Sequence, residues 1–199
     1  LATLARGLAL LPEAAKPLAE TLHAWEQWEA AHQAYVRCQA LSPGGVECHY
    51  LDAVVLRRLA QFEDAAGQFK QAVSLASGYL PAQVGLSETT LEAGALDESR
   101  RMFEALVGDG RTAPSAELGL GRLDAAAGDH NRAIAHFDRA IALFPEFGAA
   151  YYGLALSYRA LGRTADAERA MARHAQFGAR WPALEDPLRD KVVALRDDP

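Results

Sequence analysis

Residues 114–147 read PSAELGLGRLDAAAGDHNRAIAHFDRAIALFPEF, and the pattern of this segment recurs every 34 residues along the chain. A small residue recurs at Ala19, Ala53, Ser87, Gly121 and Ala155, a second small residue at Ala31, Ala65, Ser99, Ala133 and Ala167, and a bulky apolar residue at Tyr35, Phe69, Phe103, Phe137 and Met171. The three series keep one phase from residue 12 to residue 181, without an insertion or a deletion. A period of this length is typical of stacked helical solenoids.

The quoted segment predicts two helices joined by a tight turn. In the second stretch Ile134, Phe137 and Ile141 follow the spacing of three and four that places apolar side chains on one helical face. Gly128 can adopt the left-handed conformation that closes a helix, and Asp129 can cap the next one. Gly94 and Gly162 occupy the place of Gly128 in the third and fifth repeats, whereas Glu26 and Ala60 replace glycine in the first and second.

Pro43 and Pro145 end their repeats, because proline cannot continue a helix, and they set the register. The units are 12–45, 46–79, 80–113, 114–147 and 148–181, and the unbroken register favours one elongated unit. Residues 1–11 read as a helical cap on the open end or as the tail of an upstream repeat. Residues 182–199 predict a C-terminal capping helix from Leu188 to Arg196, with Asp186 as its cap, covering the last apolar face.

Composition argues against several classes of function. The 199 residues carry a formal charge of -6, which does not suit general nucleic-acid binding, since that needs a basic face. No apolar run approaches the roughly 18 residues that a membrane-spanning helix needs, so we expect no membrane insertion. We expect a soluble protein, cytoplasmic or periplasmic, and the alanine-, leucine- and arginine-rich repeats suggest a bacterial source.

The recurring residues resemble the tetratricopeptide repeat over about 170 of the 199 residues. The residues that carry the resemblance are Leu18, Ala19, Ala31, Tyr35, Cys38 and Pro43 in the first unit, Ala53, Ala65, Phe69 and Ala72 in the second, Leu120, Gly121, Ala133, Phe137, Ala140 and Pro145 in the fourth, and Tyr151, Leu154, Ala155, Tyr158 and Ala167 in the fifth. The resemblance implies an all-α, right-handed α-solenoid (a superhelix) of five helix-turn-helix units with end-capping helices.

The sequence departs from the family pattern at a few positions. Asp52 stands where leucine is expected and Asp124 where an aromatic is expected; further departures are Met171, His174 and Ala179. We expect these residues to weaken individual packing contacts and to leave the register intact.

Chemistry-bearing motifs are scarce. Neither a phosphate-binding loop nor a dinucleotide fingerprint occurs, and the glycines are interpreted as turn and repeat-end residues. The six histidines show no metal-ligand spacing, and the acids read as solvated helix faces and caps. We therefore predict neither an enzyme nor a cofactor or metal site.

Cys38 and Cys48 flank the Ser42-Pro43-Gly44-Gly45 turn, and the ends of two such helices can come within bonding distance. A disulfide would favour an extracytoplasmic location, whereas a buried free thiol at Cys38 is the ordinary alternative.

In the tetratricopeptide-repeat family the first helix of each unit lines a concave groove that binds an extended or helical peptide. Carried over to this sequence, the resemblance gives the candidate groove residues Lys16, His23, Tyr50, Val54, Arg57, Arg58, Glu88, Leu118, Arg122, Tyr152, Leu156 and Arg159. Among them Tyr50, Val54 and Arg57 recur as Tyr152, Leu156 and Arg159, with each trio on one helical face. Tyrosine and arginine often anchor interfaces, so one interpretation is a groove for a peptide with aromatic and acidic side chains. The alternative is that the arginines solvate the helix and pair with Glu88 or Glu92.

The predicted function is a non-enzymatic scaffold that binds a peptide or a partner helix. The runner-up is the recruiting or regulatory arm of a larger enzyme, and a third reading is self-assembly into a homo-oligomer through the end helices. The resemblance does not extend to the clamp that grips acidic chaperone tails, because Glu20, Leu51 and Pro81 replace the residues which that clamp uses.

Overall fold

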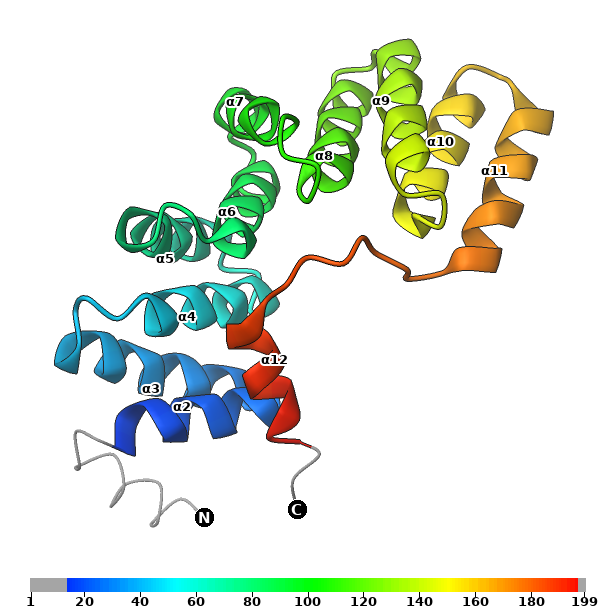
Figure 1. Ribbon diagram of the computed structural model, residues 1–199. Helices are drawn as coiled ribbons and strands as arrows, with labels where there is room; N and C mark the ends of the chain where they lie inside the picture. Colours follow the sequence, from blue (N-terminus) through cyan, green and yellow to red (C-terminus); the bar gives the residue numbers. More distant parts are fainter. Residues whose placement is uncertain (1–13, 197–199) are drawn as a thin grey trace. The chain divides into compact units, whose positions relative to one another are not determined.

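The computed structural model describes residues 14–196 and is all-helical over that range (Figure 1). The helices are α2 (Ala15–Ala24), α3 (Trp28–Leu41), α4 (Val46–Arg58), α5 (Phe62–Leu75), α6 (Leu80–Glu92), α7 (Leu96–Leu106), α8 (Ala113–Ala126), α9 (His130–Leu143), α10 (Gly148–Ala160), α11 (Thr164–Phe177) and α12 (Pro187–Ala194). Helices α2 to α11 form five consecutive pairs, one pair in each 34-residue repeat. The chain is therefore an α-solenoid of helix-turn-helix units, as the period predicted. The predicted N-terminal cap, residues 1–11, lies outside the described residues.

The turns inside the repeats share one backbone conformation. Gly94, Gly128 and Gly162 have φ angles of 82°, 81° and 72°, and Glu26 and Ala60 adopt φ of 58° and 56° at the equivalent places. The predicted cap is also present, since the Asp129 carboxylate accepts a hydrogen bond from the backbone N–H of Arg132. The first two repeats thus make the same turn as the others without a glycine.

The chain divides into two compact units. Unit 1 comprises residues up to Ala93 together with Glu185 onward, and unit 2 comprises Gly94–Leu184. Helices α2 to α6 and α12 belong to unit 1, and α7 to α11 to unit 2, so the division falls inside the third repeat. The unbroken register favoured a single unit, and nothing in the period marks this boundary.

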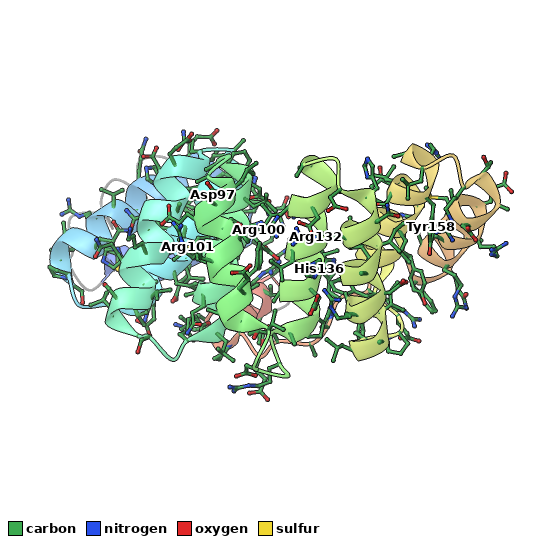
Figure 2. The ribbon with its side chains drawn as sticks, turned by 90° about the horizontal axis from the view of Figure 1, so that it is seen from above. Asp97, Arg100, Arg101, Arg132, His136 and Tyr158 are labelled. Atoms are coloured by element: carbon green, nitrogen blue, oxygen red, sulfur yellow. A yellow bond between two sulfur atoms is a disulfide. The ribbon has the colours of Figure 1, made fainter. Side chains whose placement is uncertain are left out.

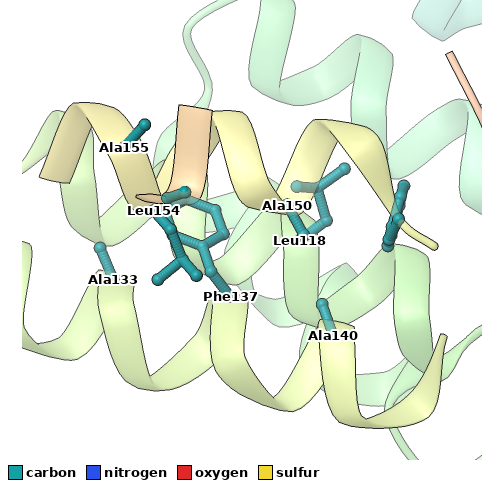
Figure 3. Packing of buried hydrophobic residues seen from close by; sticks show 9 residues of the cluster. Leu118, Ala133, Phe137, Ala140, Ala150, Leu154 and Ala155 are labelled. Atoms are coloured by element: carbon teal, nitrogen blue, oxygen red, sulfur yellow. The ribbon is translucent and has the colours of Figure 1, made fainter. Parts of the chain in front are cut away.

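The first four repeats bury the aromatic residue of the pattern, and the fifth has the partly buried Met171 in its place. In unit 2 the Phe137 ring is buried among small and aliphatic residues of α8, α9 and α10, namely Leu118, Ala133, Ala140, Ala150, Leu154 and Ala155 (Figure 3). Tyr35 and Phe69 of unit 1 are likewise buried. The small and bulky residues that define the repeat are therefore the residues that pack against one another in the core.

Two buried acids replace apolar residues of the repeat pattern. Asp52 is fully buried, where its carboxylate lies 2.7 Å from His32 Nδ1 and accepts a hydrogen bond of 2.8 Å from the Gln39 amide. Burial raises the pKa of the Asp52 carboxyl, and the contacts with His32 and Gln39 oppose that rise. The hydrogen bonds from these polar partners replace the apolar packing contact that a leucine would make at this position.

Cys38 of α3 and Cys48 of α4 are joined by a disulfide, with their Cα atoms 6.1 Å apart. The bond closes the turn between the first and second repeats. Within the described residues, no helix combines the length and the hydrophobicity that crossing a membrane requires.

Helix α12 begins at Pro187, one residue before the predicted start, and has the predicted N-cap, because the Asp186 carboxylate accepts a hydrogen bond of 3.1 Å from the backbone N–H of Arg189. Its position differs from the prediction, which placed it over the end of the last repeat. In the structure α12 lies against α2 and α4 of unit 1 (Figure 1). The reason is side-chain complementarity, because Asp186 and Lys191 form hydrogen bonds with side chains of the first two repeats.

Candidate helix-binding site

The predicted groove residues all lie on the first helices of their repeats, but they are divided between the two units. Unit 1 holds Lys16, His23, Tyr50, Val54, Arg57, Arg58 and Glu88 on α2, α4 and α6, and unit 2 holds Leu118, Arg122, Tyr152, Leu156 and Arg159 on α8 and α10.

Tyr50 forms one half of a pair of tyrosines that binds a carboxylate. Its ring is 4% exposed and makes an edge-on contact with the ring of Tyr79, with the centroids 5.0 Å apart. The Tyr50 hydroxyl donates to one carboxylate oxygen of Asp186, and the Tyr79 hydroxyl donates to the other at 2.5 Å. Burial, together with the adjacent Asp186 charge, raises the pKa of both tyrosines, so each hydroxyl stays protonated and available as a donor.

A second contact joins the middle of α12 to α2. Lys191 Nζ lies 3.0 Å from both carboxylate oxygens of Glu20, whose side chain is buried. The next residue, Val192, is 2% exposed and is the residue of α12 that is buried. At the far end Arg196 pairs with Glu26 at 3.0 Å. We call the residues of unit 1 that hold α12, namely Glu20, Glu26, Tyr50 and Tyr79, the α12-binding face.

His23 lies inside unit 1 rather than on its surface. Its Nδ1 is 3.1 Å from the Tyr35 hydroxyl, and its ring stands edge-on to Trp28 with the centroids 5.7 Å apart. Burial lowers the pKa of His23 to about 4, with further lowering by the charges of Arg189 and Arg58. His23 is thus a neutral, buried residue near neutral pH, which the sequence did not distinguish from an exposed groove residue.

Two of the predicted cations already have partners within unit 1. Arg57 bonds Glu88 at 3.1 Å and Glu92 at 2.9 Å, which ties α4 to α6. Lys16 bonds Glu47 at 2.5 Å. For Arg57 the structure agrees with the alternative interpretation, in which it pairs with the acids of the next repeat. Val54 is half-buried and Arg58 is exposed.

In unit 2 most of the predicted residues are exposed. Tyr152 and Leu156 are 45% and 42% exposed, and Arg122 and Arg159 are exposed as well. Tyr152 also contacts the ring of His174, with the centroids 5.2 Å apart. Leu118 is an exception that corrects the prediction: it is buried in the Phe137 core, so it is not available to a partner (Figure 3).

Sequence reasoning missed two features of these faces. Tyr79 and Asp186 received no role in ligand binding, and the hydrophobic spacing of the repeats holds no signal for either. The other feature is a charged network in unit 2 around two buried acids of α8: it consists of Glu117, Asp124, Arg100, Arg132, His136 and Arg139, and Figure 2 shows Arg100 on α7 and Arg132 and His136 on α9.

The contacts of this network explain why an acid is tolerated at a buried aromatic position. Asp124 accepts from Arg100 at 2.7 Å, and His136 Nε2 lies 3.4 Å from its other oxygen. Glu117 accepts from Arg139 at 3.0 Å, and His136 Nδ1 is 2.6 Å from the same carboxylate. Buried carboxylates are stable when paired and hydrogen-bonded in this way. Within residues 14–196, no group of three or more His, Cys, Asp or Glu side chains has an arrangement that could hold a metal ion.

Comparisons with known proteins agree with this architecture. Models of the tetratricopeptide repeat match residues 84–144 and 124–184. No protein of curated function matches the sequence. The solved structures that resemble the chain include residues 41 to the end of MamA from Desulfovibrio magneticus RS-1, at 16% identity and a TM-score of 0.68, covering 83% of this chain and 92% of that one.

Two further structures are similar. TTC0263, a thermophilic tetratricopeptide-repeat protein of Thermus thermophilus, has a TM-score of 0.66 at 21% identity and covers 93% of this chain and 98% of that one. YrrB, described as a tetratricopeptide-repeat protein with an unusual peptide-binding site, has a TM-score of 0.62 at 14% identity and covers 83% and 85%. At these identities the likeness concerns the fold. Together with the repeat matches and the five in-phase helix pairs, it shows that this chain belongs to the tetratricopeptide-repeat family.

Proposed function

We propose that this chain is a protein-interaction scaffold that binds a helix of a partner protein on the first helices of its repeats, at the α12-binding face. Tetratricopeptide-repeat proteins are in general non-catalytic scaffolds for other proteins or peptides, and the fold of this chain supports that general function. The peptide-binding site of YrrB, which shares this fold, is consistent with the finer proposal.

The observation that carries the proposal is the contact between α12 and unit 1. A helix from a distant part of the sequence lies against the first helices of two repeats, held by hydrogen bonds from Tyr50 and Tyr79 and by the ion pair between Lys191 and Glu20. The face therefore has hydrogen-bond donors and a charge for a docked helix, and α12 buries one apolar residue, Val192, when it lies there. A helix of a partner with similar side chains would find the same contacts.

The test uses the full chain with substitutions that weaken the binding of α12 to unit 1, so that the α12-binding face is vacant. In this vacated variant Asp186→Asn, Lys191→Ala and Val192→Asp are combined, and all three substitutions lie on α12 or its cap. A fluorescent peptide with the sequence of residues 185–196, EDPLRDKVVALR, is titrated with the vacated variant, and anisotropy reports binding.

We expect saturable binding of this peptide and none of a scrambled peptide of the same composition. Circular dichroism establishes that the vacated variant keeps the helical content of the parent. A folded vacated variant that binds neither peptide would contradict the proposed function.

A further inference from the structure

The α12-binding face contacts an acid at one end of the docked helix. Two hydroxyls, those of Tyr50 and Tyr79, converge on a single carboxylate, and each donates to a different oxygen. A carboxylate offers acceptors on both oxygens, whereas a carboxamide offers an acceptor on one side only. The same carboxylate caps α12, and Pro187 occupies the first turn. The pair of tyrosines thus favours a helix that is capped by an aspartate, and a proline directly after the aspartate suits the first turn of such a helix.

The face is also selective for a base and an aliphatic residue further along the helix. Glu20 is 4% exposed, and its carboxylate is bonded through both oxygens to Lys191, five residues after Asp186. A buried carboxylate that loses its cation is strongly unfavourable, so a helix without a base at this place would bind poorly. Val192, six residues after Asp186, is also buried.

Unit 2 lacks these recognition groups at the equivalent repeat positions. Tyr152 corresponds to Tyr50, but Trp181 replaces Tyr79 and Arg122 replaces Glu20, each 102 residues later in the sequence. At these three positions unit 2 therefore has one tyrosine, no second tyrosine hydroxyl and a charge of opposite sign. Only unit 1 has the complete set, and Tyr152 serves as a matched control for Tyr50.

Without these contacts α12 would not be stable as a helix. It has eight residues, and an isolated helix of that length is unstable in water. It is tethered by the segment 178–186, which keeps its local concentration high, so an external helix must compete against a tethered one. The docked α12 therefore has the same contact residues as the proposed ligand and competes with it for the α12-binding face.

We propose that the α12-binding face selects partner helices that begin with Asp-Pro and carry a lysine five residues and an aliphatic residue six residues after the aspartate, and that α12 occupies the face until such a helix displaces it. This inference rests on the proposed function and adds to it the chemistry of the partner and the means by which access is controlled.

The experiment compares the full-length parent with the vacated variant, using the labelled peptide of residues 185–196. We expect the parent to bind it at least about ten-fold more weakly than the vacated variant, because the tethered copy competes. In the vacated background, Tyr50→Phe, Tyr79→Phe or Glu20→Gln should weaken binding about five-fold or more, whereas Tyr152→Phe should leave it unchanged. Peptides with Asn in place of the aspartate, or Ala in place of the lysine, should lose affinity to a similar extent.

The outcomes separate the two proposals. Equal affinity of parent and vacated variant would overturn the control of access by α12. Equal affinity for the altered peptides would overturn the selectivity, although helix binding itself would stand. Absence of binding to either protein would be a failure of the proposed function. The inference is supported if the parent binds the peptide weakly, the vacated variant binds it tightly, and replacement of the aspartate or the lysine in the peptide lowers the affinity.

Discussion

At the scale of single residues, glycines inside helices make room for the aromatic rings of the preceding repeats. A Cβ placed on Gly85 would lie 2.7 Å from the ring of Phe69, and one on Gly153 would lie 2.5 Å from the ring of Phe137. Gly119 has the same relation to a ring of the repeat before it. The three glycines are 34 residues apart. The sequence interpretation of glycine as a turn residue therefore missed a packing function that recurs with the period.

Replacing one of these glycines tests that function. In Gly85→Ala the gain in helix propensity, about 1 kcal/mol, is outweighed by overpacking against Phe69, so the free energy of unfolding should fall by roughly 1–2 kcal/mol. Gly67 lies in α5 of the same unit, and a Cβ there would have no atom within 4 Å. Gly67→Ala should raise the free energy of unfolding by about 0.5–1 kcal/mol. Urea denaturation of both variants provides the measurement, and equal shifts would argue against the close approach.

Ala60 offers the opposite change at a turn. Its φ of 56° is costly for a residue with a Cβ, and glycine occupies the equivalent position in three other repeats. Ala60→Gly should therefore increase the free energy of unfolding by about 0.5–1 kcal/mol, since relief of strain exceeds the entropy cost of glycine. Thermal denaturation checks this, and a lower melting temperature would refute it.

At the scale of helices, the pKa of His23 is lowered by burial and, to a smaller extent, by the charge of Arg189 on α12. The folded pKa of about 4 lies below the ordinary 6.5, so between these values the unfolded chain binds a proton that the folded chain does not. The free energy of unfolding should therefore fall as the pH is lowered from 6.5 to 4, by up to about 3 kcal/mol from this residue. His23→Gln should reduce that loss, which denaturation at pH 7 and pH 4.5 would measure.

The pKa of His23 can also report whether α12 lies close to it. Burial is the main cause of the lowered pKa, and the charge of Arg189, on α12, is the next. In the vacated variant the charge of Arg189 moves away, so an NMR titration should find the pKa of His23 closer to 6.5 than in the parent. An identical titration curve in the two proteins would mean that α12 does not lie over His23.

At the scale of the whole molecule, the 34-residue period was sufficient to predict the helices and their pairing. The resemblance to the family predicted Tyr50 as a groove residue, and in the structure Tyr50 contacts Asp186. The period could not predict where α12 lies: Lys191 and Glu20 are 171 residues apart, and their contact depends on side-chain complementarity rather than on periodicity. Asp186 was recognised as a helix cap from its local sequence, whereas its bonds to Tyr50 and Tyr79 are formed only in the folded chain.

The most direct test of the account is a double-mutant cycle between Tyr50→Phe and Asp186→Asn, read as the free energy of unfolding of unit 1. Asparagine keeps the helix cap, so the cycle isolates the bond between α12 and α4. A Trp181→Phe background leaves Trp25 and Trp28 as fluorescence reporters, both in unit 1. We predict a coupling energy of about 1–2 kcal/mol, because either substitution alone removes the same charge-assisted hydrogen bond. Strictly additive effects, within about 0.3 kcal/mol, would contradict it.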